Sequence, residues 1–207
     1  MLLDIHSHKP APYPEGIINV APDEFMPLEG QLYSVGIHPW NTSGGISEDL
    51  MKKLDEAAAH PQVVAIGECG VDVSKGGPMF RQLQVFRHHV ELSERLRKPL
   101  VIHCVKGADI ILGLKRDLEP TLPWIIHGFR GKPALAQQLL NAGLLLSYGP
   151  KFNPESVALT PAEALLAETD DSPESIAEVI AALSEAASRP LETEIASLLL
   201  KTIHPGR

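Results

Sequence analysis

Two histidines separated by a single residue stand near the start of the chain, in the run Asp4-Ile5-His6-Ser7-His8. Because alternate side chains of a strand face the same side, His6 and His8 would project together, about 7 Å apart along the backbone. Two imidazoles in that arrangement can bind one metal ion. Asp4 shares their face and could orient a histidine through a hydrogen bond. The alternative is a pair of surface histidines near a terminus.

Four more residues of metal-binding types follow apolar runs later in the chain: Glu68 after VVAI, His103 after PLVI, His127 after LPWII, and Asp170 after ALLAET. Each alone has an ordinary explanation, such as a hydrogen-bonded core histidine or, for Asp170, a helix N-cap. Residues at the carboxyl ends of barrel strands, however, converge on one mouth. The six residues therefore predict a single polar cluster.

Four histidines and two carboxylates can hold two ions if one carboxylate bridges them. Nitrogen and oxygen ligands without thiolate favour Zn, Mn or Co, and they admit Mg where water and substrate oxygens complete the shell. Two such ions can activate a water and stabilise the leaving oxygen of a phosphoester. They can equally polarise the carbonyl of an amide or ester, so the metal chemistry leaves both reactions open.

The remaining histidines give weaker signals. His38, in Gly36-Ile37-His38-Pro39, also ends an apolar run but has no partner at strand spacing. We therefore expect it to contact substrate or to support a ligand. The others lie on helix-like or terminal stretches, and we expect them at the surface: His60, His88, His89 and His204.

The elements that must position these residues alternate along the chain. Short runs rich in Val, Ile and Leu predict strands at residues 2–8, 17–21, 32–38, 63–68, 99–104, 122–128, 144–149 and 164–170. Helix-like segments lie between and after them: Ser47–His60, Pro78–Lys98, Ala108–Leu118, Pro133–Ala142, Pro173–Ser188 and Leu191–Ile203. Apolar strands alternating with amphipathic helices indicate a parallel sheet covered on its outer face. Eight strands favour a closed (β/α)8 barrel.

The early part of this pattern is irregular. Residues 9–34 are rich in proline, and the connection between the second and third predicted strands is too short for a full crossover helix. We therefore predict a distorted TIM barrel with a degenerate early β/α unit. No linker or internal repeat interrupts the chain, which predicts one domain over residues 1–207.

Composition limits the class of protein. The chain is 44% hydrophobic and 21% charged, which is typical of a soluble globular protein. No apolar run approaches the roughly 20 residues that span a bilayer, and the first residues do not resemble a secretory signal. Two cysteines, Cys69 and Cys104, do not make a disulfide framework, so we expect reduced thiols and a cytoplasmic location.

The net charge of −8 excludes an overall basic field for binding long nucleic acid. A local basic collar at the barrel mouth is still compatible with the sequence, because five cations follow predicted strand ends: Lys75, Lys106, Arg130, Lys132 and Lys151. Such a collar suits a phosphate-bearing substrate, whereas solvated loop charge is the alternative. Trp40 and Phe129 lie near the same rim, where they could stack on a base or serve in packing.

In order along nearly the whole chain, the motifs DIHSH, VGIHPW, AIGECGVD, PLVIHC, IHGFRG, LLLSYG and LLAETD resemble the TatD family of metal-dependent deoxyribonucleases. That family belongs to the amidohydrolase-like superfamily of distorted TIM barrels. The resemblance implies that His6, His8, Glu68 and Asp170 hold one ion, and that Glu68 bridges to a second ion held by His103 and His127. It also implies that Asp170 is the base for the attacking water and that His38 lies near the substrate phosphate.

The chain departs from the family around the predicted substrate. It is shortened between His8 and Gly36, and Val105-Lys106 stands where the family has an arginine two residues after its histidine. Arg130 replaces a serine, and Asp171-Ser172-Pro173 replaces Ala-Pro-Tyr. The metal-binding residues are thus retained while their surroundings differ, which makes Lys106 and Arg130 candidate substrate contacts.

The sequence therefore predicts a two-metal hydrolase that cleaves phosphodiester bonds, in DNA ends or short nucleotides, with Glu68 and Asp170 as its catalytic carboxylates. One alternative is an amidohydrolase acting on a C–N or ester bond. Related enzymes of that kind often use a carboxylated lysine where this chain has Glu68, which disfavours it. Another alternative is a catalytically weak protein that binds metal or a partner.

Overall fold

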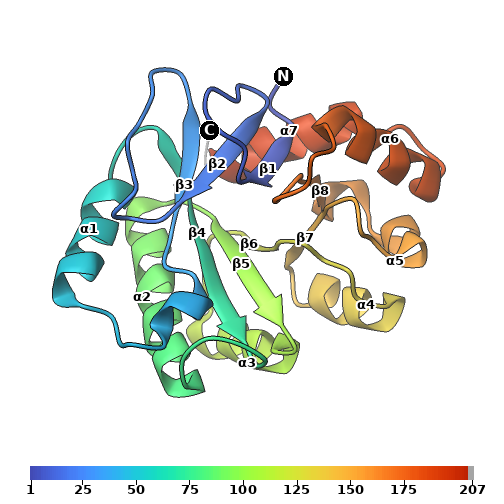
Figure 1. Ribbon diagram of the computed structural model, residues 1–207. Coiled ribbons are helices and arrows are strands. Elements are labelled where there is room, and N and C mark those ends of the chain that lie inside the picture. The colour runs from blue at the N-terminus through green and yellow to red at the C-terminus, as the bar shows by residue number, and fades with distance from the viewer. Residues whose placement is uncertain (205–207) are drawn as a thin grey trace.

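The computed structural model describes residues 1–204, in which eight parallel strands follow one another around a closed barrel in chain order (Figure 1). The strands are β1 (Asp4–Ser7), β2 (Gly16–Val20), β3 (Leu32–Val35), β4 (Val63–Asp72), β5 (Leu100–Val105), β6 (Trp124–Ile126), β7 (Leu145–Tyr148) and β8 (Leu165–Ala167). The barrel closes where β1 pairs with β8 through Asp4 and Ala167. The predicted TIM barrel is confirmed.

Seven α-helices and two short 3-10 helices complete these residues. They are η1 (Pro39–Thr42), α1 (Glu48–Ala58), α2 (Met79–Leu96), α3 (Ala108–Leu118), α4 (Pro133–Asn141), α5 (Pro154–Leu159), η2 (Ala162–Ala164), α6 (Ile176–Ala187) and α7 (Glu192–Ile203). All six predicted helices are present, while the six-residue α5 was not foreseen because it is too short to show a period. Within residues 1–204, no helix is both long and apolar enough to cross a bilayer.

One helix begins later than its sequence suggested. Helix α6 starts at Ile176 and not at Pro173, because Ser175 is the N-cap. The Ser175 side chain accepts a hydrogen bond from the Glu178 amide, and the Glu178 carboxylate accepts one from the Ser175 amide. This reciprocal capping box satisfies two otherwise unpaired amides. Asp170 is consequently not a helix cap, so the ordinary explanation for its presence does not hold.

The connections before β2 and before β3 contain no helix, as the short spacing predicted. In Figure 1 these blue loops run over the barrel where the other strands carry helices. Gln31, which is almost fully buried, ties the two loops together. Its side chain accepts a hydrogen bond from the Tyr13 amide (2.6 Å) and donates to the Gly16 carbonyl (3.0 Å). Side-chain hydrogen bonds thus hold the part of the barrel where helix packing is missing.

Strand β4 is longer than predicted, because it continues past Glu68 to Asp72. Its pairing with β5 shifts register between Ile66 and Cys69. Gly67 lies within this irregularity and Gly70 directly follows it, with φ values of 139° and 141°, a backbone conformation that residues with a side chain rarely adopt. Glu68 therefore lies inside a bent strand and not at its end.

The interior of the barrel is filled by apolar side chains from its strands, among them Ile5, Ile17, Val101, Ile125 and Leu166, all fully buried. Leu199 and Ile203 of α7 pack into the same cluster. Helix α7 thereby covers the amino ends of the strands, and the carboxyl ends are left to form the site.

Candidate metal centre

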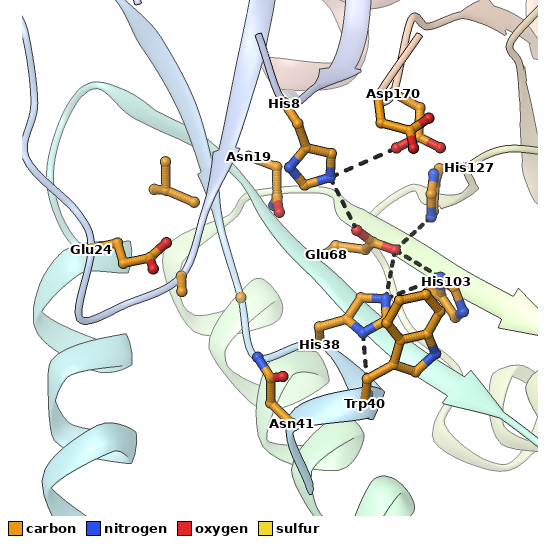
Figure 2. Close-up of a pocket in the computed structure, with 14 residues that line it drawn as sticks. His8, Asn19, Glu24, His38, Trp40, Asn41, Glu68, His103, His127 and Asp170 are labelled. Atoms are coloured by element: carbon orange, nitrogen blue, oxygen red, sulfur yellow. Dashed lines mark hydrogen bonds and ion pairs between the residues drawn. The ribbon is translucent and has the colours of Figure 1, made fainter. Parts of the chain in front are cut away.

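All six predicted ligand residues meet at one mouth of the barrel, although Glu68 lies inside its strand. Five of them line a cavity of about 420 Å3, which His38 also lines: His8, Glu68, His103, His127 and Asp170 (Figure 2). His6 lies behind this wall, fully buried, with its Nε2 atom 3.4 Å from Glu68 Oε2. The cluster predicted from strand-end positions is therefore present as a cluster.

Glu68 lies at the centre of this group, and its two oxygens face different histidines. Oε1 is 2.7 Å from His103 Nδ1, 2.7 Å from His127 Nε2 and 3.0 Å from His38 Nε2. Oε2 is 3.4 Å from His6 Nε2 and 3.7 Å from His8 Nε2. One carboxylate thus joins two sets of nitrogen atoms.

Asp170 completes the set around Oε2. Its Oδ1 atom is 3.7 Å from both His6 Nε2 and His8 Nε2. The Asp170 amide donates to the His6 carbonyl, and the His8 amide donates to the Asp170 carbonyl, so backbone pairing fixes all three residues together. Asp170 has a φ of 54°, a left-handed conformation that aspartate tolerates better than most residues.

The donor atoms fall into three groups that could each hold an ion: His6 with His8 and Glu68, His6 with His127 and Asp170, and His38 with Glu68 and His103. His38 was expected to contact substrate or to support a ligand, and the structure brings it as close to Glu68 as the predicted ligands. Its Nδ1 atom accepts a hydrogen bond from the Trp40 amide, which leaves Nε2 directed at Glu68.

The protonation preferences of the cluster share one cause. Burial would raise the pKa of Glu68, but the charge of His127 and the hydrogen bonds from the surrounding histidines outweigh it and hold that pKa far below its usual range. The nearby Glu68 carboxylate raises the pKa of His8. The carboxylates therefore favour positive charge on the atoms that face them.

The geometry of His6 fits a bound cation. Both of its ring nitrogens are buried, and neither has a hydrogen-bond partner among residues 1–204. Buried polar atoms are nearly always satisfied, so the Nε2 atom, which faces two carboxylates, requires a partner. A divalent ion between His6 Nε2, Glu68 and Asp170 would supply that partner, because nitrogen and oxygen donors of this kind suit Zn, Mn or Co.

Asp4 supports the cluster differently from what the sequence suggested. It contacts no histidine ring; its Oδ1 atom accepts hydrogen bonds from the amides of His6 and Thr169, each at 3.2 Å. Its Oδ2 atom accepts from the Thr169 hydroxyl (2.6 Å) and the Tyr13 hydroxyl (3.1 Å). Burial raises the pKa of Asp4 to about 7. Asp4 thus connects strand β1 to the segment that carries Asp170.

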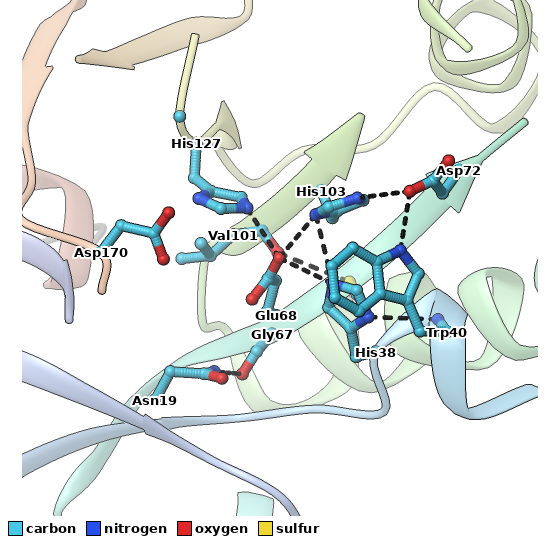
Figure 3. A network of polar contacts seen from close by, with 12 residues as sticks. Asn19, His38, Trp40, Gly67, Glu68, Asp72, Val101, His103, His127 and Asp170 are labelled. Carbon is cyan, nitrogen blue, oxygen red and sulfur yellow. Dashed lines mark hydrogen bonds and ion pairs between the residues drawn. The ribbon is translucent and has the colours of Figure 1, made fainter. Parts of the chain in front are cut away.

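Two further carboxylates were not singled out from the sequence. Glu168 Oε1 accepts a hydrogen bond from the Gly128 amide (2.7 Å) and lies 3.3 Å from His127 Nδ1. Asp72 Oδ2 lies 3.2 Å from His103 Nε2. Glu168 lies two residues before Asp170, and Asp72 lies four residues after Glu68. The alternation of side chains along a strand therefore predicts that each shares a face with a predicted ligand. Each contacts the ring nitrogen of its histidine that does not face Glu68, and so orients that histidine. Figure 3 shows Asp72 in this position beside His103.

His89 was expected at the surface, and that prediction is wrong. Its ring is fully buried, and Nε2 accepts a hydrogen bond from the Ile37 amide (2.9 Å) while Nδ1 donates to the Val85 carbonyl (2.8 Å). Burial lowers the pKa of His89 to about 4. A neutral histidine on α2 therefore fixes the backbone next to His38.

Of the three predicted substrate contacts, His38 lines the main cavity, whereas Arg130 and Lys106 lie outside it. Arg130 and Lys151 line an adjoining cavity of about 290 Å3, which shares Asp170 with the first. Lys106 is exposed and lines neither of these two cavities. Phe129 is buried against Tyr148, so it serves in packing and not at the rim.

Comparison with known proteins agrees with the motifs. A family model described as TatD related DNase matches residues 28–195. A Mycobacterium tuberculosis protein named uncharacterized metal-dependent hydrolase TatD is 31% identical over 150 residues. An Erwinia billingiae protein named 3'-5' ssDNA/RNA exonuclease TatD is 33% identical over 150 residues. Each alignment covers 66% of this chain but only 56% of the relative.

Solved structures show the same fold. The TatD homologue YJJV of Escherichia coli superimposes with a TM-score of 0.77 at 20% identity, covering 97% of this chain and 96% of that chain. A TatD family hydrolase of Entamoeba histolytica gives a TM-score of 0.75 at 16% identity, covering 98% and 97%. At these identities the likeness concerns the barrel and does not extend to substrate.

Proposed function

Because the chain belongs to the TatD-related DNase family, we propose that it is a hydrolase with two divalent ions that cleaves phosphodiester bonds at the ends of single-stranded nucleic acid. The observation that carries this proposal is the position of Glu68. Its Oε1 atom faces His103 and His127 at 2.7 Å, and its Oε2 atom faces His6 at 3.4 Å. A shared carboxylate between two sets of donors suits a two-ion centre.

The proposed ligands divide accordingly. His6, His8 and Asp170 with one oxygen of Glu68 would hold one ion, and His103 and His127 with the other oxygen would hold the second. His38 lies close enough to join the second set. Such ions, Mg, Mn, Zn or Co, neutralise phosphate charge and lower the pKa of a water when they are bound.

Asp170 is the proposed base. Of the two predicted catalytic carboxylates, Glu68 is almost fully buried and surrounded by histidines, whereas Asp170 is 25% exposed and lines both cavities. Asp170 can therefore reach a water next to the substrate and accept its proton. Glu68 contributes fixed negative charge that holds the surrounding nitrogens in place.

The proposed substrate is a nucleic acid end or a short nucleotide. The Erwinia billingiae relative is named as an exonuclease on single-stranded DNA and RNA, which supports this class. Arg130 and Lys151 beside Asp170 could hold a phosphate next to the one that is cleaved. Lys106 is the weaker candidate, since it lines neither cavity.

A panel of substrates and metals tests the proposal. We expect wild-type protein to cleave bis-p-nitrophenyl phosphate and to shorten end-labelled single-stranded DNA with at least one of Mg, Mn, Co or Zn. Asp170→Asn should lose at least 100-fold in kcat, the order of a general-base contribution, whereas His204→Ala, an exposed histidine, should retain activity. Cleavage of p-nitroacetanilide without phosphodiester cleavage would indicate the amidohydrolase alternative, and no turnover of either substrate would indicate a non-enzymatic metal-binding protein.

A further inference from the structure

An aromatic ring stands at the mouth of the main cavity with no role in the proposed chemistry. Trp40 belongs to η1, lines the cavity beside His38 and Asn41, and is 46% exposed. The other tryptophan, Trp124, is completely buried. A large indole left in solvent beside a polar site is a typical feature of ligand recognition, because aromatic faces are enriched where molecules bind.

The ring is held rigidly in place. Its Nε1–H donates to Asp72 Oδ2 at 2.7 Å, and the same carboxylate accepts the amides of Ser74 and Lys75 through Oδ1. The Gln82 side chain closes this loop, since it accepts from the Asp72 amide and donates to the Asp72 carbonyl. A ring fixed before binding loses little conformational entropy when a ligand stacks on it.

A cation lies directly over the ring. The Lys75 ammonium is 4.3 Å from the centre of the Trp40 ring, and the Lys75 side chain is exposed. A surface cation–π contact of this kind contributes little energy, so a stacking ligand can displace the flexible side chain. An aromatic face with a mobile ammonium beside it is complementary to a group that is both planar and anionic, as a nucleotide is.

The ring also lies close to the metal-binding residues. The centre of the Trp40 ring is 4.7 Å from that of His38 and 5.8 Å from that of His103, as Figure 3 illustrates. Asp72 connects these residues, because Oδ2 lies 3.2 Å from His103 Nε2 as well as accepting from Trp40. A planar group on Trp40 would therefore be a near neighbour of a phosphate bound by the proposed ions beside Glu68.

We propose that Trp40 and Lys75 form a subsite for the nucleobase next to the cleaved bond, in which the base stacks on the indole and the ammonium contacts an adjoining phosphate. This inference rests on the proposed function. It adds that the base must be unstacked from its neighbours, which single strands permit and duplexes do not.

Tryptophan fluorescence in EDTA tests binding without turnover. Oligodeoxythymidylate should quench Trp40, whereas an abasic oligonucleotide of equal length and charge should leave the emission unchanged; Trp124 is buried and serves as a constant background. Equal quenching by both oligonucleotides would show that the phosphates alone are bound, and no quenching by either would exclude stacking. Both of these results overturn the subsite.

Paired variants separate the ring from its hydrogen bond. Trp40→Phe and Trp40→Ala both lose the donor to Asp72, but only the alanine loses the ring. We expect Trp40→Ala to weaken the binding of a dye-labelled oligothymidylate by roughly 5- to 150-fold, the range for one base stack. Trp40→Phe should lose much less. Phe80→Ala, which removes an aromatic ring that is 65% exposed and lies outside the main cavity, should bind as wild type does.

The cation has its own test. Lys75→Met should lower the salt dependence of binding by about one released ion, whereas Lys52→Met, on the exposed face of α1, should not. Equal affinity of Trp40→Ala and wild type, with hydrolysis intact, would overturn the subsite and leave the proposed function standing. Base-dependent quenching without hydrolysis under any of the four metals would support the subsite and overturn the proposed function.

Discussion

Glu168 lies directly behind His127. Its Oε1 atom is 3.3 Å from His127 Nδ1, while His127 Nε2, across the ring, is 2.7 Å from Glu68 Oε1. Because Glu168 accepts at Nδ1, it keeps the proton there and leaves Nε2 free to bind a cation.

Replacing Glu168 should therefore weaken metal binding without removing a ligand. We expect Glu168→Ala to lower Mn affinity about 10- to 100-fold, the usual effect of losing the partner that orients a ligand histidine. Glu168→Gln keeps an acceptor and should lose less. Calorimetric titration with Mn measures both, and unchanged affinity in Glu168→Ala would show that Gly128 and the strand alone position His127.

Divalent ions should stabilise the fold. An ion at 100 times its dissociation constant adds about 2.7 kcal/mol to the free energy of unfolding, which corresponds to a rise in Tm of roughly 5–10 °C for a chain of this size. Differential scanning calorimetry with and without Mn measures the rise. His6→Ala should abolish most of it and His204→Ala should not; an equal rise in both variants would mean that the ions bind elsewhere.

Gly36 should tolerate no side chain. A Cβ atom there would lie 2.6 Å from the Glu68 carbonyl oxygen and from backbone atoms of Gly67. We expect Gly36→Ala to lower the free energy of unfolding by about 1–3 kcal/mol and to displace Glu68, with loss of metal affinity. Gly113→Ala in α3 meets no atom within 4 Å and should stabilise the protein by about 0.5–1 kcal/mol. Urea denaturation compares the two, and equal stability would contradict the close approach.

His89 should make the fold sensitive to acid. Folding lowers its pKa from 6.5 to about 4, so below pH 6.5 the unfolded chain binds the proton more tightly than the folded chain. Its contribution to stability is complete above pH 6.5 and declines as the pH falls toward 4, by up to about 2 kcal/mol at pH 5. In EDTA, His89→Gln should show a smaller loss between pH 7 and pH 5 than wild type and than His204→Gln. Identical losses in all three proteins would assign the acid sensitivity to other groups.

Most of the barrel could be predicted from the sequence, because each strand is a short apolar run and each long helix has a clear hydrophobic period. The sequence also located the clustered residues, since strand ends converge on one mouth. Three points stay predictions: that these residues bind two ions, that residues 1–207 form one domain, and that the protein is cytoplasmic.

Residues that act through another residue were harder to find. Alternation along the strands points to Asp72 and Glu168, but which histidine each contacts is recognisable only once the histidines are placed in space. His89 lies four residues after Val85 on the buried face of α2, so the helical period contained its position. Its polar ring nevertheless favoured the surface, and its partner, the Ile37 amide, comes from a distant segment. Such contacts depend on tertiary structure and not on local pattern.

The closure of β1 on β8 sets the stage of synthesis at which the centre can be complete. Ser7 and Thr169, which bond across that closure, are 162 positions apart. A nascent chain that has emerged only through His127 already carries Glu68 and every histidine of the cluster, but it lacks Asp170 and the strand that seals the barrel. Since a domain generally folds as a unit, we expect the centre to be complete only when the two ends of the barrel meet.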